Sequence, residues 1–192
     1  MSISLDDVEK LQAVYPDYRI ELREGKLIVM SPSDSTSGEI GARFIRLVGT
    51  WLDDHDLGRI LDASTGFRLP NGDLLSPDVS FVSRERLKQN PRTYLSVVPQ
   101  LIVEIKSSRD RLRELEEKIA LFLRQGAQVG LLIDPDTHTV SVYRSSGLSN
   151  NADSGESLPP GTTLRDGDTL SIPELFPGWE IPIMSLWPPV YE

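Results

Sequence analysis

Apolar positions in the first third of the chain change from a strand pattern to a helical one. Two short apolar-rich runs, 18–22 and 27–30, flank a polar tetrapeptide, which predicts a β-hairpin. Residues 31–38 are rich in serine, which is typical of a loop. From residue 39 to about 54, apolar side chains recur at helical spacing, so we expect an amphipathic helix with Ser37 as its N-cap.

The middle of the chain predicts a β-sheet. Residues 74–82 are apolar apart from a few positions and predict a strand with an irregular point at Pro77. The compact runs 101–105 and 129–133 are rich in apolar and β-branched residues, which is typical of buried central strands. Residues 139–143 follow as the predicted hairpin partner of the second of these strands.

A helical pattern lies between the two buried strands. Its apolar positions fall on one face, and Gly126 follows its last turn, as expected of a helix C-terminus. Ser107 or Ser108 is in position to cap its start. A helix that joins two buried strands predicts a right-handed parallel crossover.

The C-terminal part predicts irregular structure and short strands. Residues 145–161 are rich in Ser, Gly, Asn and Pro, which favours a mobile surface loop, and short strands follow over 164–190. Taken together, the elements predict one α/β domain over residues 1–192. We expect a mixed central sheet flanked by helices, with an N-terminal hairpin and short C-terminal strands.

Composition limits the classes of function. The chain has 192 residues, a net charge of −9 and no cysteine. The missing cysteines exclude disulfides, thiolate metal sites and cysteine nucleophiles, and the acidic charge argues against a protein that coats nucleic acid. The N-terminus is polar, and no apolar run is long enough to span a bilayer. These features predict a cytoplasmic protein.

Glu104 is the first candidate for chemistry, because it lies in the otherwise apolar run 101–105. A buried carboxylate is costly unless a partner compensates it. Alternate residues of a strand share a face, so Glu104 and Lys106 are expected to point the same way. An ion pair at the strand end would explain this short motif. Its position before a crossover helix, however, is where α/β sheets bind ligands.

Asp78 is the second candidate, because it follows Pro77 inside an otherwise apolar strand. It could simply bind its own backbone at an irregular point. If the two strands pair, Asp78 and Glu104 meet, and two carboxylates held together require a proton or a cation between them. Oxygen ligands favour Mg²⁺ or Mn²⁺, and a nearby lysine could stabilise charge on a phosphate.

These residues resemble the PD-(D/E)XK nuclease superfamily, in which a Pro-Asp pair precedes a Glu-x-Lys motif on a buried strand. Here the two motifs are 26 positions apart, from 78 to 104. Within the superfamily, the chain is similar over residues 15 to 190 to the Uma-type restriction endonuclease family, much of which is a domain of unknown function. The matching stretches are 27–32, 38–41, 64–72, 76–80, 103–107 and 130–135.

The resemblance implies a role for each matching residue. Asp78, Glu104 and the carbonyl of Ile105 would hold the metal, and Lys106 would be the catalytic lysine. Glu39 matches an acidic residue that often completes the metal site.

Two of the matching residues have equally simple explanations. An ion pair between Glu39 and Arg43, four residues apart on a helix, is as good a reading of Glu39. Lys118 falls where the family commonly has a lysine, although a solvated helix charge would explain it as well.

The implied function is a Mg²⁺- or Mn²⁺-dependent endonuclease that hydrolyses DNA phosphodiester bonds. Because a duplex has two strands to cut, we expect a homodimer. The alternative is a catalytically silent nuclease fold that serves as a binding or regulatory module, which the acidic charge favours.

Overall fold

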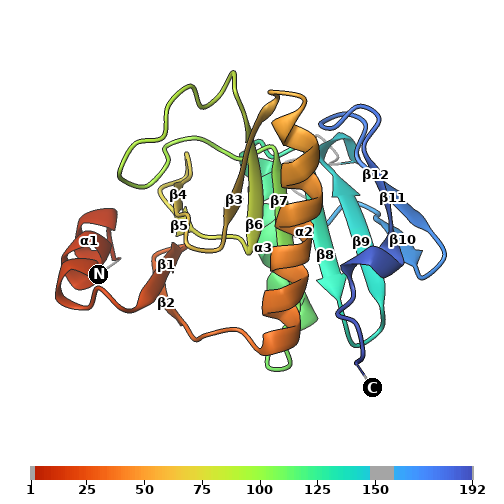
Figure 1. Cartoon of the computed structure of the whole chain (residues 1–192). Coiled ribbons are helices and arrows are strands. Elements are labelled where there is room, and N and C mark those ends of the chain that lie inside the picture. The colour runs from red at the N-terminus through yellow and green to blue at the C-terminus, as the bar shows by residue number, and fades with distance from the viewer. Residues whose placement is uncertain (1–2, 148–157, 192) are drawn as a thin grey trace.

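The computed structural model describes residues 3–147 and 158–191 (Figure 1). Its main element is a six-stranded mixed sheet with strand order β10-β9-β8-β7-β6-β3. These strands are β3 (Gly58–Asp62), β6 (Val79–Ser83), β7 (Leu101–Ile105), β8 (Val129–Asp134), β9 (Thr139–Arg144) and β10 (Thr162–Arg165). Strands β7 and β8 are parallel, and the other neighbours are antiparallel. The predicted mixed sheet with a parallel crossover is confirmed.

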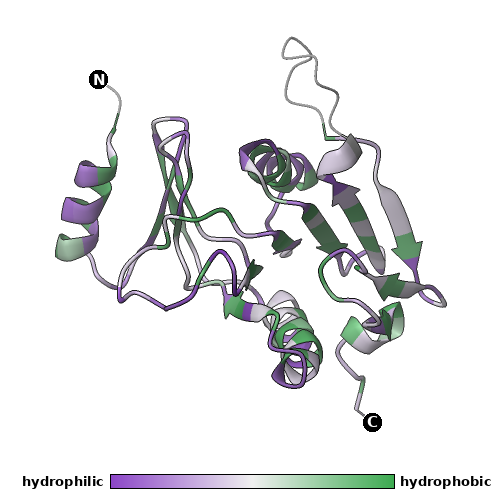
Figure 2. Ribbon diagram, turned by 90° about the horizontal axis from the view of Figure 1, so that it is seen from above, coloured by the Kyte–Doolittle hydropathy of each residue, from purple (hydrophilic) through white to green (hydrophobic). Residues whose placement is uncertain are grey.

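Two helices cover opposite faces of this sheet, α2 (Ser35–Asp53) and α3 (Leu112–Gln125). Strand β7 alternates between them, since Val103 belongs to the core cluster under α2 and Ile102 to the cluster under α3. In Figure 2 the hydrophobic colour gathers on the sheet strands and on the helix faces turned toward them. Every residue of β7 is buried, so Glu104 is held within a core strand.

A second, four-stranded sheet with the order β2-β1-β5-β4 forms an N-terminal lobe. Its strands are β1 (Arg19–Arg23), β2 (Lys26–Met30), β4 (Phe67–Arg68) and β5 (Leu74–Leu75). The predicted hairpin is confirmed as β1 and β2. The predicted strand 74–82 is divided at Pro77, because β5 pairs with β1 whereas β6 pairs with β7. The chain therefore crosses from one sheet to the other immediately before Asp78.

The C-terminal part closes the core on the α2 side. Strands β11 (Thr169–Ser171) and β12 (Glu180–Pro182) pair with each other, and the short 3-10 helix η2 (Ile183–Leu186) follows. Phe176 and Trp179 pack edge to face and join the core cluster under α2. The predicted short C-terminal strands are confirmed.

Several local predictions are wrong. Helix α1 (Leu5–Val14) was not expected, although Ser4 and Asp7 form a capping box at its start. Helix α2 begins at Ser35 with Asp34 as N-cap, because the Asp34 side chain accepts the backbone N–H of Ser37. The start of α3 has no side-chain cap at all, since it begins at Leu112, well after the two serines.

Part of the predicted loop 145–161 has regular structure. Ser145–Gly147 form a short 3-10 helix, η1, and residues 148–157 lie outside the described residues. Gly126 ends α3 as predicted, in the left-handed conformation with φ +115°. In the described ranges, none of the helices has the length and apolarity to cross a membrane.

The contact between β8 and α3 requires a glycine at position 130. A Cβ atom added there would lie 2.4 Å from Cγ2 of the fully buried Ile119. We expect Gly130→Ala to lower the free energy of unfolding by about 1–3 kcal/mol, as overpacking does in cores. Urea denaturation followed by circular dichroism measures this change.

Gly38→Ala in α2 is the matched control, because an added Cβ meets nothing within 4 Å there. It should be neutral or stabilise the protein by about 0.5–1 kcal/mol, since alanine favours a helix over glycine. Equal stabilities of the two variants would contradict the close β8–α3 packing.

Candidate active site

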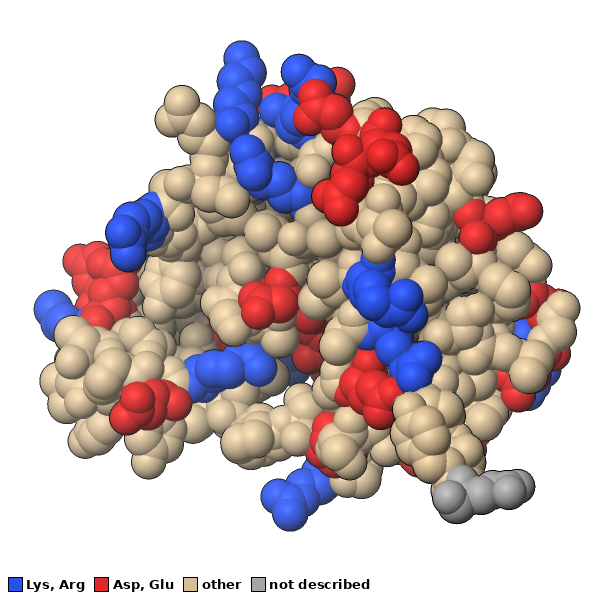
Figure 3. All heavy atoms as spheres, viewed as in Figure 1, with Lys and Arg blue, Asp and Glu red and all other residues tan. Residues whose placement is uncertain are grey.

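A cavity of about 440 Å³ lies between the N-terminal lobe and the six-stranded sheet. Its walls come from the hairpin β1–β2, residues 31–34, residues 107–110 after β7, and α3. Asp78 and Glu104 both line it. Figure 3 shows the surface hollowed between the lobe at left and the main body, with acidic and basic side chains interspersed over this face. The cavity therefore opens at the carboxyl end of β7.

Strand pairing brings Asp78 and Glu104 together. Val79 of β6 lies opposite Val103 of β7, so the residues next to them reach the same end of the sheet. The backbone N–H of Ile105 donates to Oδ2 of Asp78 at 2.8 Å, which fixes the Asp78 carboxylate against β7. The Glu104 side chain is 3% exposed. The carboxylates of Asp78 and Glu104 thus lie next to each other, largely buried, at the wall of the cavity.

Lys118 of α3 supplies the positive charge beside these carboxylates. Its Nζ lies 3.1 Å from Oε1 of Glu104 and 2.8 Å from Oε1 of Glu21, and it donates to the carbonyl of Ser76 at 2.9 Å. Lys118 is 5% exposed, so the interpretation of Lys118 as a solvated helix charge is wrong.

Glu21 is the site residue that the sequence reasoning missed. It is buried on β1, and its Oε1 also accepts the backbone N–H of Ser76 at 2.7 Å. A signal for it exists in the sequence, because Arg19, Glu21 and Arg23 alternate with the apolar Ile20 and Leu22. Alternation in a strand places the three charges on one face.

The electrostatics of the site favour an added cation. Burial raises the pKa of Glu104 to about 8, and the neighbouring charges of Asp78 and Glu21 add to this rise against the opposing effect of Lys118. Burial also raises the pKa of Asp78. Burial opposes the charge of Lys118, but the carboxylates of Glu104 and Glu21 raise its pKa above the ordinary value. The charges of Lys118, and of Arg19 near Asp78, therefore offset the effect of burial on the two carboxyl groups only in part.

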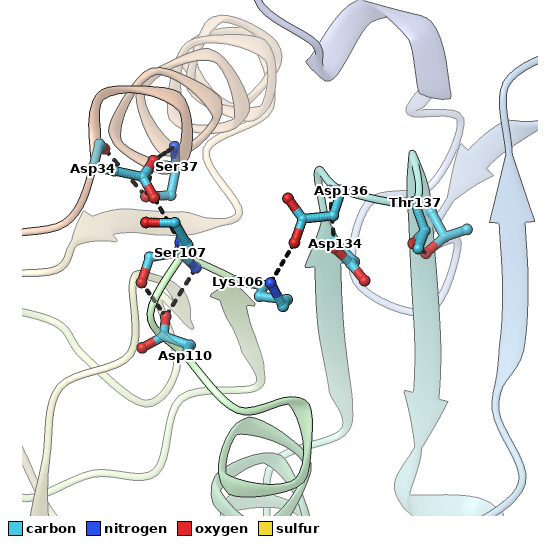
Figure 4. Close-up of polar contacts among 10 residues, drawn as sticks. Asp34, Ser37, Lys106, Ser107, Asp110, Asp134, Asp136 and Thr137 are labelled. Carbon is cyan, nitrogen blue, oxygen red and sulfur yellow. Dashed lines mark hydrogen bonds and ion pairs between the residues drawn. The ribbon is translucent and has the colours of Figure 1, made fainter.

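Lys106 is not brought to the two carboxylates. Its side chain forms an ion pair with Asp136, in the turn between β8 and β9, and points toward that turn in Figure 4. Its backbone N–H donates to the carbonyl of Ile133, and Lys106 does not line the cavity. The hydrogen bond that Lys106 donates to Asp136 raises the pKa of Lys106, so this lysine is a charged group next to the site.

Glu39 is also outside the cavity in this structure. Its Oε1 lies 2.9 Å from Nε of Arg43, and its side chain is 45% exposed. The ion pair within α2, which was the simpler explanation of Glu39, is the one observed.

Two aspartates fix the backbone around the cavity mouth (Figure 4). Asp34 accepts the N–H of Ser37 at 3.0 Å and the N–H of Ser108 at 2.7 Å, and these bonds lower its pKa to about 2. Asp110 accepts the N–H and the hydroxyl of Ser107 at 2.9 and 2.6 Å. The bond between Asp34 and Ser108 joins the start of α2 to the segment that follows the Glu-x-Lys motif.

The donor atoms of the site fit a small divalent cation. Oε1 of Glu104 is buried without a hydrogen bond, although Lys118 lies within ion-pair distance. In the described part of the chain, no group of three or more His, Asp or Glu side chains is spaced to bind a metal. Magnesium commonly uses one or two carboxylates and keeps several waters. Asp78 and Glu104, which both line the cavity, are two carboxylates of this kind.

Comparisons with known proteins bear on the family and on the fold of the chain. The model of the Uma2 family, described as "Putative restriction endonuclease", matches residues 5–184. Among solved structures, the fold is similar to a protein from Anabaena variabilis ATCC 29413 described as "a putative nuclease belonging to DUF820". The TM-score is 0.78 at 21% identity, over 96% of this chain and 97% of that one. No curated protein matches the chain.

The raised pKa of Glu104 makes the stability of the metal-free protein depend on pH. The unfolded chain loses this proton near the ordinary value of 4.5, whereas the folded protein keeps it up to about 8. The free energy of unfolding therefore falls as the pH rises through this window. Glu104→Gln removes this loss. The Tm of the variant minus the Tm of wild type should therefore be larger at pH 8 than at pH 5, by several degrees.

Differential scanning fluorimetry in EDTA measures the effect. Glu180→Gln, at an exposed position of β12, is the control and should follow wild type at every pH. Parallel pH profiles of wild type and Glu104→Gln would show that Glu104 ionises normally in the folded protein.

Proposed function

We propose that this chain, which belongs to the Uma2 family, is a Mg²⁺- or Mn²⁺-dependent endonuclease that hydrolyses DNA phosphodiester bonds. The observation that carries the proposal is the pair Asp78 and Glu104, which lines the cavity. Burial raises the pKa of both carboxyl groups and the neighbouring cations offset this only in part, so full ionisation of the pair requires more positive charge. A divalent cation would supply the missing charge, and phosphodiester hydrolysis is the chemistry that carboxylate-bound magnesium commonly assists.

Asp78, Glu104 and the Ile105 carbonyl would hold the ion. When bound, it would polarise the scissile phosphate and lower the pKa of an attacking water. Asp78 is kept in place for this by the N–H of Ile105. Glu104 is kept in place because it belongs to β7, a strand whose residues are all buried. A fixed ligand pair limits where the phosphate can lie, which is the positioning that phosphoryl transfer requires.

Lys118 is the lysine that would act on the reacting group, because it lies beside Glu104 and lines the cavity. Glu21 and the Ser76 carbonyl hold its ammonium beside Glu104, and its raised pKa keeps it charged. A fixed positive charge stabilises the negative charge that builds on phosphate in the transition state. Lys106, which the motif implies, would have to leave Asp136 to take this role.

Glu39 keeps its implied role as a prediction. Glu39 lies near the start of α2, close to Ser37, whose N–H donates to the cavity-lining Asp34. Release from Arg43 would leave its carboxylate available near the cavity mouth.

A binding or regulatory module without turnover is the second candidate. Two observations favour it: the net charge of −9 and the engagement of both lysines, Lys106 and Lys118, by carboxylates. Such a module would still bind a divalent cation and would show no cleavage.

A cleavage assay on supercoiled, linear and single-stranded DNA with Mg²⁺ or Mn²⁺ separates the two candidates. Wild type should cleave, and Asp78→Asn should lose at least about 100-fold, as expected when charge stabilisation of the transition state is removed. Lys118→Met should lose a similar factor, and Lys106→Met less. Glu180→Gln is the control and should keep wild-type activity.

Calorimetric titration with Mn²⁺ completes this test. Binding by wild type that Asp78→Asn abolishes, together with no cleavage of any DNA, would establish the module in place of the enzyme. Because breaking a buried ion pair costs about 3–5 kcal/mol, the Tm of Lys118→Met is measured first, and activity is compared at a temperature where the variant is folded.

We also expect a homodimer in solution, since cutting both strands of a duplex is simplest with two copies of one site. Multi-angle light scattering at the protein concentration of the cleavage assay tests this. A mass near 21.4 kDa at all concentrations would contradict it.

A further inference from the structure

Strand β1 turns a row of charged side chains toward the cavity. Arg19, Glu21 and Arg23 occupy alternate positions of the strand and line the cavity. The residues between them face the other way, and Leu22 packs with Val8 of α1. The N-terminal lobe therefore contributes charge to the cavity wall opposite β7.

The three charged side chains of this row differ in whether they have a hydrogen-bond or ion-pair partner. Glu21 binds Lys118 at 2.8 Å. Arg23 contacts the carbonyl of Glu114 at 3.4 Å and the carboxylate of Glu117 at 3.8 Å. Nη2 of Arg19, in contrast, is buried and finds no hydrogen-bond partner among the described residues. A buried donor of a charged group without an acceptor is costly, so Arg19 is the member of the row that a ligand would satisfy.

Neutralisation of Asp78 does not account for Arg19. The positive charge of Arg19 acts on Asp78, but Arg19 forms no ion pair within 4 Å with any carboxylate of the described residues. Oδ2 of Asp78 is instead occupied by the N–H of Ile105. The guanidinium of Arg19 therefore lies near the Asp78 carboxylate and keeps N–H donors free for another acceptor.

We propose that Arg19 forms an anion subsite that binds a phosphate group of the nucleic-acid strand in the cavity. This proposal rests on the proposed function, because it assigns the contact that holds the substrate of that site. A guanidinium presents paired N–H donors that match two phosphate oxygens. The position of Arg19 across the cavity from Glu104 would place the bound phosphate between the lobe and the metal ligands.

This subsite also accounts for how an acidic chain binds a polyanion. Acidic and basic side chains are mixed over the face in Figure 3, without a continuous basic stripe. A partly buried arginine inside the cavity is screened less by salt and water than a surface charge. A few such contacts can therefore hold a strand where the net charge of −9 would repel it.

The test is binding of a short fluorescein-labelled single-stranded DNA, measured by fluorescence anisotropy in EDTA over a range of salt concentrations. Arg19→Gln should raise Kd on the order of tenfold, which is the loss of one charge-assisted hydrogen-bond pair. The slope of log K against log salt should fall by about 0.7, the value for one phosphate contact on a single strand. Arg19→Lys should keep the slope and lose part of the affinity, because a lysine cannot form the fork.

Arg165→Gln, which removes an exposed arginine on β10 at the far edge of the sheet, is the matched control and should bind as wild type does. Equal effects of Arg19→Gln and Arg165→Gln would overturn the subsite, as would the absence of DNA binding by wild type. Because Arg19→Lys keeps the charge, it remains informative if Arg19→Gln unfolds.

Failure of the subsite differs from failure of the proposed function. Cleavage by wild type with unchanged binding by Arg19→Gln would remove the subsite and leave the nuclease. Weakened binding by Arg19→Gln without any cleavage by wild type would leave the subsite and remove the nuclease.

Discussion

The ammonium of Lys118 joins the parts of the molecule from which the site is built. Its partners are Glu21 on the four-stranded sheet, Glu104 on the six-stranded sheet, and the carbonyl of Ser76 in the segment between the two sheets. Since Lys118 belongs to α3, a helix, two sheets and a connection meet at one buried charge. Glu21, Glu104 and Lys118 all line the cavity, so it lies where these elements meet through polar groups.

This arrangement explains why the carboxylates tolerate burial. Glu104 alone in the core strand would be costly, because a low-dielectric interior disfavours an isolated charge. The positive charge of Lys118 offsets part of that cost. Protonation of Glu104 offsets a further part, as its pKa of about 8 indicates. Both compensations are incomplete, since one oxygen of Glu104 has no hydrogen bond. A site with this residual imbalance gains more from a cation than a site already neutral would.

The sequence predicted the six-stranded sheet well and the site in part, for physical reasons. Local apolar runs predict strands β7 and β8 and the crossover between them. The pairing of β6 with β7, which brings Asp78 to Glu104, was only a condition at the sequence level and is shown by the structure. The burial of Lys118 was beyond reach, because a charge on a helix looks solvated until tertiary packing covers it. Glu21 was missed although its alternation with apolar residues in β1 is visible in the sequence. The true N-cap Asp34 was missed because Ser37, within the same loop pattern, is an equally good cap by propensity. Helix α1 was missed because its polar sequence has a single fully buried residue, Val8.

The two lysines show how the position that a motif implies can differ from the contacts that a structure shows. In an ideal continuation of β7, Lys106 would lie beside Glu104. The chain instead leaves the strand at Ile105, and Asp136 from the neighbouring hairpin binds the Lys106 ammonium. Lys118 then occupies the position next to Glu104 from the helix that covers this face. The proposed phosphodiester hydrolysis would need a positive charge at that point in space, whichever element supplies it. A lysine from α3 would meet that need as well as one that follows β7, because the first turns of α3 and the end of β7 line the same cavity.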